Sequence, residues 1–590
     1  MKKAFMLLCT ALVMFSVTAV AQNVTVTGRI TDASTGEGIP FAYVLLKNEK
    51  VGSMSDANGN YSITLPKEGI LVYSSVGYHS AEVKVGTRRQ IDIALSPDLE
   101  LIDETVVIAY GTTTKKSFTG SAAVVSSDEI AKRVTSTVTN ALAGTTPGVQ
   151  VISSTGDPAA GGGAIRIRGI GSMSASSAPL YVVDGMPFDG SISDINPNDV
   201  ESISVLKDAS ASAIYGARGA NGVVLITTKK AGHGVPNVKF DAKVGSNSRL
   251  IPNYDIITEP GLYYETWYKL MYNSKLYSGS SVAEAYAYAD KNLLNENNGG
   301  LGYLVYTLPE GQNLVGHNFK LNPNATLGYD DGEYYYIPDN WYDEVFHNSL
   351  RQEYNVSISG NSGGLNYYAS VGYLNDGGII SNSDYKRYTA RINADYRAKS
   401  WLRFTTNLSY SYSDSQSPGS YSWGSSGNIF YIANNIAPIY PLYVRNSNTH
   451  DILTENGRTV YDSNNTNFKR AAFTGNAVRD NEYNAKHNYA DVLTGKFGVV
   501  LTPVKGLDIQ ANLGLTNDNT RSNALYSMFG SSSADDGAAS VSHTRLFTVN
   551  SQLLATYKTD FGGSRHHFDV LAGYERYNLT SQACWYRRRC

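Results

Sequence analysis

The chain contains 590 residues, with 49 basic and 52 acidic side chains and a formal net charge of −3. This near balance excludes a global field that would attract nucleic acid or an anionic membrane surface. Tyrosine, with 43 residues, is the commonest aromatic, glycine reaches 55, and no stretch after residue 21 is apolar enough for a membrane-spanning helix. These features are typical of a transmembrane β-barrel, whose strands alternate apolar and polar residues. A soluble secreted β-protein is the alternative, and composition alone favours it.

Residues 1–21 have the parts of a secretory signal peptide. A basic start precedes an apolar run, and a small-residue cleavage site places Ala21 before Gln22. A transmembrane anchor needs roughly 20 apolar residues and a charged stop, whereas this run is shorter and lacks the stop. We therefore expect an exported protein that begins near Gln22. Only two of the three cysteines follow the signal, so no disulfide framework is expected.

Residues 22–98 are predicted to form a small β-sandwich. Short β-prone runs are separated by turn residues at the spacing of such a fold. The six runs lie at residues 24–30, 41–47, 61–65, 70–75, 81–85 and 91–95. Asn58-Gly59 predicts a hairpin turn with positive φ at both residues. We expect the domain to fold on its own around Phe41, Tyr43, Tyr61, Ile63, Leu71 and Tyr73.

Two patterns in this domain suggest metal ligands, and each has a simpler explanation. Residues 56–58 (Asp-Ala-Asn) resemble a calcium loop, but Lys67 stands where the closing glutamate is needed, so a turn is favoured. His79 and Glu82 have a zinc-ligand spacing, but His79 follows a turn and the next histidine is His233. We therefore predict no metal, no cofactor and no enzymatic activity.

Residues 99–111 form an isolated β-prone run between Pro97 and a Thr/Lys-rich linker. Such a run suits an orphan strand that pairs with the sheet edge of another chain. A linker, or a last strand of the preceding domain, is the alternative. We expect residues 104–110 to be mobile until a partner binds.

Residues 165–230 predict a compact α/β unit. Strands are expected at residues 165–167, 181–183, 201–206 and 223–228, with an Asp184-Gly185 turn, an Asn196-Pro197 helix start, and a short helix from Asp208 to Gly216. The unit contains no acid–base pair and no cluster of metal ligands, so a mechanical role is favoured over a catalytic one.

The runs VVDGMPF, NPNDVESISVLKDASASAIYG and ARGANGVVLITTK in this unit resemble the plug domain of TonB-dependent outer-membrane transporters of the SusC/RagA family. The resemblance implies a plug at residues 117–232. The motif residues are Arg166, Arg168, Gly169, Asp184, Gly185, Asn196, Pro197, Glu201, Lys207, Asp208, Tyr215, Gly216, Arg218, Gly219, Asn221 and Gly222. Arg166 and Arg168 are expected either to make a buried ionic contact with the barrel wall or to lie on a solvated face.

The same family resemblance extends towards the N-terminus. GRITD, IPFAYV, SDANGNYSI and SSVGY are similar to a carboxypeptidase-regulatory-like domain, and DETVVIAYG is similar to the family's TonB box, DEVVVVGYG. The implied box, within residues 99–116, consists of Asp103, Glu104, Thr105, Val106, Val107, Ile108, Ala109, Tyr110 and Gly111. Thr105 and Ala109 depart from the family pattern but keep strand propensity.

Residues 233–590 alternate as antiparallel barrel strands. We expect nine of them, at residues 238–244, 353–359, 366–373, 385–396, 401–412, 491–502, 506–515, 547–558 and 566–577. A long insertion at residues 250–346 has one expected helix at residues 261–272. Residues 413–488 are expected to form an extracellular loop, in which Trp423 and Phe430 either stack on sugar rings or pack within the loop.

Nine strands close a ring only about 18 Å across, whereas the plug measures roughly 30 Å. Plugged outer-membrane transporters have about 22 strands, which would give about 44 Å. The last residues, 585–590, place three arginines together where a strand would alternate. We therefore expect a C-terminally truncated barrel that fails to assemble alone.

The resemblance implies TonB-dependent import of an oligosaccharide or peptide across the outer membrane. The implied partners are the TonB-ExbB-ExbD complex and a SusD-like surface lipoprotein, with the N-terminal domain and TonB box in the periplasm. The substrate-binding residues are not indicated. A non-transporting surface binding protein, a non-functional fragment and a secreted hydrolase are the alternatives. The last lacks a nucleophile–base or metal constellation in the sequence.

Overall fold

A computed structural model describes most of the chain. The described residues are 23–33, 36–47, 51–66, 69–75, 78–96, 105–108, 111–114, 122–152, 158, 163–171, 174, 176–208, 212–230, 236–250, 255–417, 428–462, 476–529, 537–561 and 566–589. They belong to two compact units, one formed by residues 1–106 with 112–119 and one by residues 107–111 with 120–590. Among the described residues, no helix is both long and apolar enough to cross a membrane.

The first unit contains the predicted sandwich. Its two sheets have the strand orders β4-β1-β7 and β3-β2-β5-β6. The strands are β1 (Asn23–Asp32), β2 (Tyr43–Leu46), β3 (Gly52–Met54), β4 (Asn60–Pro66), β5 (Ile70–Ser74), β6 (Ala81–Lys84) and β7 (Ile93–Leu95). All six predicted strands are confirmed, and β3 was not predicted. Four predicted core residues are buried as expected, namely Tyr61, Ile63, Leu71 and Tyr73.

The predicted register of β2 is wrong by one residue. Phe41 and Tyr43 are 66% and 42% exposed, whereas Ala42 and Val44 are 0% exposed. Because side chains alternate along a strand, a shift of one residue exchanges the buried set for the exposed set. The interior already holds the rings of Tyr61 and Tyr73, with centroids 5.5 Å apart. Small aliphatic side chains from β2 fill the space that these rings leave.

The turn before β4 is organised by a carboxylate. Asp56 accepts hydrogen bonds from the amides of Asn58, at 2.9 Å, and Asn60, at 2.8 Å. These bonds, led by that from Asn60, lower the pKa of Asp56. Gly59 has a φ of +84°, but Asn58 is absent from the residues with positive φ, so the predicted pair of positive φ angles is wrong. The Asp56 side chain fixes the turn instead.

The plug, in the second unit, is a five-stranded sheet in the order β10-β15-β16-β13-β14 beside a β11-β12 hairpin. Its elements are β10 (Ala122–Ser126), α2 (Ser127–Ala131), α3 (Val138–Ala141), β11 (Val149–Ile152), β12 (Ala164–Ile167), β13 (Leu180–Val183), β14 (Met186–Pro187), η2 (Ile192–Asp194), η3 (Pro197–Asp199), β15 (Val200–Leu206), η4 (Ala213–Gly219) and β16 (Val223–Thr228). The predicted strands are confirmed.

Both predicted plug turns are present. Asp184 and Gly185 have φ angles of +49° and +80° and join β13 to β14, as a two-residue hairpin requires. Gly216 was predicted to end a helix; with φ +59° and ψ −146° it breaks the helical geometry inside η4, which continues to Gly219. The first residues of the expected helix, 209–211, lie outside the described residues. Asn196 accepts a hydrogen bond from the Asn198 amide and starts η3, as its sequence position indicates.

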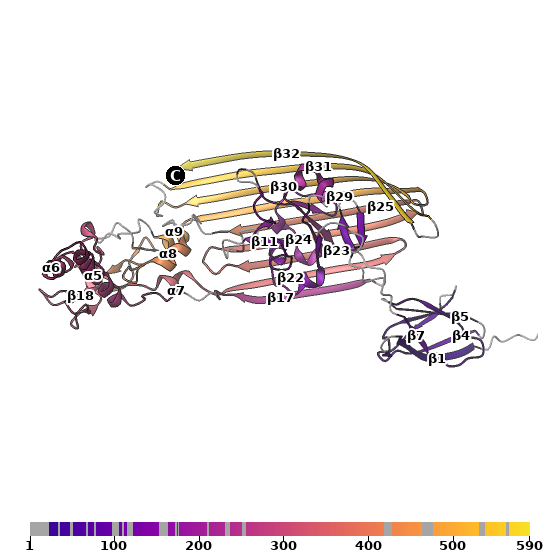
Figure 1. The fold of residues 1–590 in the computed structure, drawn as a ribbon, viewed down its shortest axis with the longest axis horizontal. Coiled ribbons are helices and arrows are strands. Elements are labelled where there is room, and N and C mark those ends of the chain that lie inside the picture. The colour runs from indigo at the N-terminus through magenta and orange to yellow at the C-terminus, as the bar shows by residue number, and fades with distance from the viewer. Residues whose placement is uncertain are drawn as a thin grey trace, which may run out of the picture. The chain divides into compact units, whose positions relative to one another are not determined.

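The nine predicted barrel strands form one antiparallel sheet, in which neighbours in space are neighbours in this series (Figure 1). They are β17 (Asn237–Asn247), β22 (Ser349–Ser362), β23 (Leu365–Gly377), β24 (Asp384–Lys399), β25 (Leu402–Gln416), β29 (Ala485–Val504), β30 (Leu507–Tyr526), β31 (Ala538–Phe561) and β32 (His566–Arg589). The expectation that the arginine-rich tail is unsuited to a strand is wrong, because β32 pairs with β31 as far as Arg589. Backbone pairing continues there although polar and apolar residues do not alternate.

The insertion and the long loop pack together. Their helices are α5 (Pro260–Tyr277), α6 (Val282–Asn292), α7 (Trp341–Val345), α8 (Ile429–Asn435) and α9 (Ala477–Tyr483), with the 3₁₀ turn η5 (Glu296–Asn298). The short strands are β18 (Tyr306–Thr307), β19 (Thr326–Leu327), β20 (Tyr329–Asp330), β21 (Tyr334–Tyr336), β26 (Arg445–Asn446), β27 (Thr454–Glu455) and β28 (Arg458–Thr459). The predicted helix corresponds to α5, while α6 was not predicted.

Aromatic rings make the interior of this region. Tyr303 packs edge-on against Tyr336 and Tyr440, with centroids 5.6 and 5.3 Å away. Residues from the insertion and from the long loop therefore share one core. Phe430 packs at 5.8 Å against Phe346 of the insertion, so this loop ring has a protein partner. Trp423 lies outside the described residues.

Candidate functional site: the contact between the plug and the nine-stranded sheet

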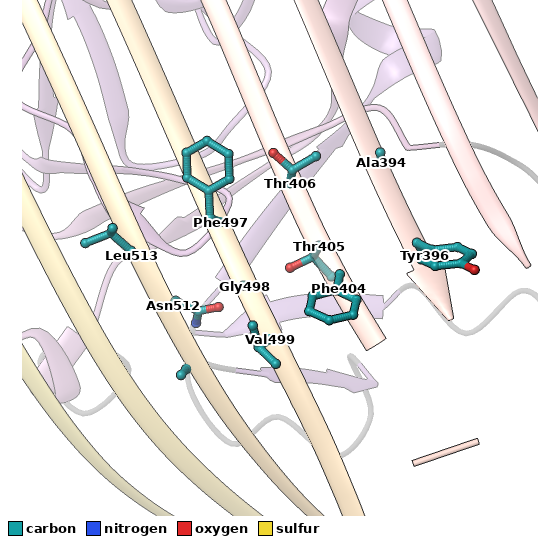
Figure 2. A pocket seen from close by; sticks show the side chains of 11 residues that line it. Ala394, Tyr396, Phe404, Thr405, Thr406, Phe497, Gly498, Val499, Asn512 and Leu513 are labelled. Carbon is teal, nitrogen blue, oxygen red and sulfur yellow. The ribbon is translucent and has the colours of Figure 1, made fainter. Parts of the chain in front are cut away.

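The two faces of the nine-stranded sheet differ in chemistry. On the apolar face, the rings of Tyr396, Phe404 and Phe497 line a shallow hollow of about 470 Å³ (Figure 2). Each of these rings is between 44% and 48% exposed. The opposite face buries polar side chains, among them Arg351, Glu353, Asn355, Ser370, Asp376, Arg387, Thr389, Arg391, Asn393, Ser411, Ser413, Asn512, Thr516, Asp518, Asn550 and Gln552. Many of these contact the plug, and we call them together the plug–sheet contact.

The Asp184-Gly185 turn reaches three strands of the sheet. The Asp184 carboxylate accepts a hydrogen bond from Asn407 of β25, and its carbonyl oxygen accepts one from Lys496 Nζ of β29 at 2.7 Å. The carbonyl oxygen of Gly185 accepts a hydrogen bond from Gln552 Nε2 of β31 at 3.2 Å. The tight turn, built from two residues with positive φ, therefore presents polar groups to the sheet.

Asp199 is the second carboxylate at this contact. Its Oδ1 accepts hydrogen bonds from Tyr368 Oη at 2.9 Å and Ser370 Oγ at 2.6 Å, both on β23. Arg391 of β24 lies between the two plug carboxylates, 3.8 Å from Asp199 and 3.8 Å from Asp184. Asp199 and its three partners Tyr368, Ser370 and Arg391 are all buried, so the charge of Asp199 is paired rather than solvated.

Asn196 adds a neutral contact. Its Nδ2 donates to Asn355 Oδ1 at 2.8 Å and to Thr389 Oγ1 at 3.1 Å. Gly372 leaves the space for this amide, because a Cβ atom there would lie 2.5 Å from Asn196 Nδ2. A glycine inside a strand marks a close approach by another segment, and here that segment is the plug.

The side chain of Arg387 binds backbone carbonyl oxygens of the plug. Its Nη1 donates to the carbonyl oxygen of Ser136 at 3.0 Å and to that of Ile195 at 3.4 Å, and also to the carbonyl oxygen of Ser193. A buried guanidinium that is shared among carbonyl oxygens holds the η2 loop in place. Ser136 also donates to the carboxylate of Asp376 on β23.

Of the two alternatives expected for Arg166 and Arg168, the contacts of the described residues favour a solvated face over an ionic contact with the sheet. Arg168, whose side chain is 55% exposed, pairs with Asp208 within the plug. Arg166 donates to the carbonyl oxygen of Ile165 at 3.1 Å. β12 pairs only with β11 among the described strands, and the printed contacts of both arginines lie within the plug.

Other motif residues hold loops of the plug itself. Lys207 Nζ donates to the carbonyl oxygen of Pro147 at 3.0 Å, and Asn221 Nδ2 donates to that of Ser176 at 2.8 Å. Arg218 pairs with Asp189 at 3.0 Å, and its guanidinium also lies 4.2 Å from the centroid of the Tyr577 ring on β32. Glu201 is exposed on β15, Tyr215 is partly exposed, and Gly219 and Gly222 are buried.

The predicted TonB box is only partly described. Thr105–Ile108 forms β8, which pairs with β9 (Gly111–Thr114) in a separate two-stranded sheet. The expectation of an unpaired strand is therefore wrong. The threonine run after Gly111 has the β propensity that this pairing uses. Asp103, Glu104, Ala109 and Tyr110 lie outside the described residues, as do the cleavage-site residues Ala21 and Gln22.

The zinc spacing in the sandwich does not lead to a site in the described part of the chain. Glu82 forms an ion pair with Lys47 at 2.6 Å, and the His79 amide donates to the carbonyl oxygen of Ser96. Among the described residues, no group of three or more histidine, cysteine or carboxylate side chains is placed to hold a metal ion.

Sequence reasoning missed the sheet side of the contact, which includes Arg387, Arg391, Tyr368 and Lys496. In a single sequence these residues are the expected polar half of an alternating strand. A charged side chain at a position that alternation places on the lumen face is the signal that would have identified the arginines.

Two family descriptions match the chain. The TonB-dependent receptor plug domain matches residues 114–223, and the CarboxypepD_reg-like domain matches residues 26–107. These matches fall on the plug and on the sandwich.

Relatives agree with both matches. The TonB-dependent receptor SusC of Bacteroides thetaiotaomicron is 32% identical over 415 residues, which are 69% of this chain and 35% of that protein. The TonB-dependent receptor P26 of Formosa agariphila is 34% identical over 389 residues, covering 65% and 34%. A solved structure of the RagAB peptide transporter aligns with a TM-score of 0.58 and 26% identity, covering 79% of this chain and 49% of that one.

By its sequence matches and its fold, the chain thus belongs to the TonB-dependent receptors. Within that class it belongs to the SusC/RagA type, whose plug, sandwich and sheet it carries. It spans about a third of the length of SusC and P26 and about half of the RagAB chain.

Proposed function

We propose that the protein serves TonB-dependent import of a nutrient across the outer membrane, with the plug closing the path along the polar face of the sheet. The plug–sheet contact carries this proposal. It consists of individual hydrogen bonds and ion pairs, such as those of Asp184, Asp199 and Asn196. Water can replace such bonds one at a time, because each has a net free energy of only about 0.5–1.5 kcal/mol, or about 1.5–3 kcal/mol where one partner is charged.

In this proposal the segment at residues 103–111 is the part of the chain on which the force acts. It forms a strand beside TonB by edge pairing, and the TonB-ExbB-ExbD complex supplies the force. Among the described strands β8 pairs with β9 alone, so its other edge is the one that the new partner would use. The role requires no catalytic step.

The division of the chain follows from this role. We propose a signal peptide at residues 1–21, a periplasmic sandwich at 22–98, the TonB box and linker at 99–116, the plug at 117–232 and part of the barrel at 233–590. The motif residues of the plug position its loops, while Asp184, Gly185 and Asn196 hold it against the sheet.

A SusD-like surface lipoprotein is the proposed extracellular partner, and the cargo is an oligosaccharide or a peptide. The SusC relative and the RagAB transporter, whose description names peptides, support this pair of classes. The neighbouring genes discriminate between them. Glycoside hydrolases beside a SusD-like gene indicate a glycan, and peptidases indicate a peptide.

A substitution within the TonB box tests the proposed function. In the native gene, Val107→Pro removes a backbone N–H and blocks strand pairing, so uptake should fall to the level of a deletion of residues 103–111. Val107→Thr keeps strand propensity and should preserve most uptake. Surface binding of the nutrient should remain in both variants. Unchanged uptake in the proline variant would remove the proposed role of this segment.

A further inference from the structure

Asp194 differs from the other plug carboxylates at the plug–sheet contact. It ends η2 and is 7% exposed. Ser413 Oγ of β25 donates to its Oδ1 at a long 3.4 Å. Its Oδ2 is buried and has no hydrogen-bond partner among the described residues. A buried carboxylate oxygen without a partner is costly while it carries charge.

Among the described residues no cation forms an ion pair with Asp194, although the charge of Arg387 acts on it and lowers its pKa. The guanidinium of Arg387 faces the same loop, but its Nη1 is engaged by the backbone carbonyl oxygens of Ser136, Ser193 and Ile195. The ion pairs of the described residues do not include Asp194, in contrast to Asp184 and Asp199, which both face Arg391.

Apart from Arg387 and from Arg391, which lines the same cavity, the groups considered around Asp194 are acidic or neutral. Asp518 of β30 is 6% exposed and acts on it as a like charge. The hydroxyl of Tyr385, on β24, donates to the carbonyl oxygen of Ser193 next to it. Thr520 Oγ1 donates to Oδ1 of Asp518 at 3.1 Å, so Asp518 has a neutral hydrogen-bond partner here.

Asp194 is one of the residues that line a small cavity. Its volume is about 30 Å³, and Asp194, Asp199, Arg391 and Ser411 are among the residues that line it. Three of its lining residues have a buried side-chain atom without a hydrogen-bond partner among the described residues, namely Asp194 Oδ2, Arg391 Nε and Ser411 Oγ. A polar cavity holds a water molecule when it offers at least about 10–15 Å³ and two to four polar partners, and this cavity meets both conditions.

We propose that Asp194 is a proton-binding site buried between the plug and the sheet, with one ordered water molecule in the adjoining cavity. The proton makes the carboxyl a neutral donor, which can hydrogen-bond to the water. The water also accepts a hydrogen bond from Nε of Arg391 and hydrogen-bonds to the hydroxyl of Ser411. This inference goes beyond import, because the site exists in the resting contact whether or not a nutrient is transported.

The electrostatics support the same assignment. Burial, and then the charge of Asp518, raise the pKa of Asp194 from 3.8 to about 7. A carboxyl with a raised native pKa binds more protons in the closed contact than after release into water. The contact is therefore most stable at low pH, and it loses this stabilisation as the pH rises from about 4 to 7.

Hydrogen exchange of the backbone amides of residues 192–196 measures how often the contact opens. The whole chain in detergent micelles is compared at pH 5 and pH 8, after correction for the intrinsic pH dependence of exchange. We expect the opening constant to rise by roughly 10- to 100-fold from pH 5 to pH 8. The readout involves no transport, so its failure is distinguishable from failure of the proposed function.

Three variants test whether Asp194 is the group that binds the proton. Asp194→Asn should remove the pH step and hold exchange near the low-pH level of the wild type. Asp518→Asn should keep the step and move its midpoint to lower pH. Glu201→Gln, at an exposed position of the plug, should leave the step unchanged. A wild type without a step, a step that persists in Asp194→Asn, or a midpoint unmoved by Asp518→Asn would overturn the proposal. The first and third outcomes decide even if Asp194→Asn fails to fold.

Discussion

The interior of the plug and its contact with the sheet are both buried, but they are built from different chemistry. The interior consists of aliphatic side chains from neighbouring strands, such as Ile203 and Val205 on β15 and Val224 on β16, each 0% exposed. The contact consists of directed polar pairs, such as Tyr368 with Asp199 at 2.9 Å. One region depends on the exclusion of water, and the other on bonds that water can also make.

This difference assigns different roles to the two regions. Apolar burial is non-directional, and it is lost only when the plug itself opens. A polar pair exchanges its partner for water at a small net cost. We therefore expect the plug to separate from the sheet as a folded unit under a load that leaves its own sheet intact.

The largest expected effect is on the plug interior. Ile203→Ala should destabilise the plug by about 2–5 kcal/mol, because it leaves a cavity at a fully buried site. Glu201→Ala, two residues earlier on the same strand and exposed, should change stability by less than about 0.5 kcal/mol. Denaturant titration of the whole chain, followed by hydrogen exchange in β15 and β16, measures both. Equal effects of the two substitutions would contradict an apolar interior.

A smaller effect is expected at the contact. Tyr368→Phe removes one hydrogen bond to the buried carboxylate of Asp199 and should weaken docking by about 1.5–3 kcal/mol, with exchange inside the plug sheet unchanged. Tyr373→Phe is the matched control, because the Tyr373 ring stacks with Tyr354 and its position alternates with the buried lumen positions of β23. Faster exchange in β15 after Tyr368→Phe would show that the two regions are not separable.

The smallest effect is expected in the sandwich, where the direction in which a side chain points decides whether it is buried. Val44→Thr places a hydroxyl in an apolar interior and should cost the isolated domain, residues 22–98, about 1–3 kcal/mol. Tyr43→Thr changes a half-exposed neighbour and should stay within about 0.5 kcal/mol. Thermal unfolding compares the two, and the wild-type domain should melt cooperatively whether or not a chelator is present. A larger loss for Tyr43→Thr would reinstate the register expected from the sequence.

Much of the fold could be predicted because local patterns are strong in it. Alternation located the nine strands of the sheet, and Asp184-Gly185 located a hairpin whose φ angles only a few residue types adopt. The compact aromatic region was missed, because the Tyr303 ring gains its partners Tyr336 and Tyr440 from segments distant in the sequence.

The sequence by itself determined the classes of element, the plug motif and the order of the strands, since each depends on residues close together in the chain. Tertiary structure decided which face of β2 is buried, that Arg168 pairs inside the plug, and that Asp194 Oδ2 is buried without a hydrogen-bond partner among the described residues. Those outcomes depend on which groups meet across distances of many residues, and burial sets the free energy of each meeting. A charge that is unremarkable on an alternating strand becomes decisive once another surface removes its water.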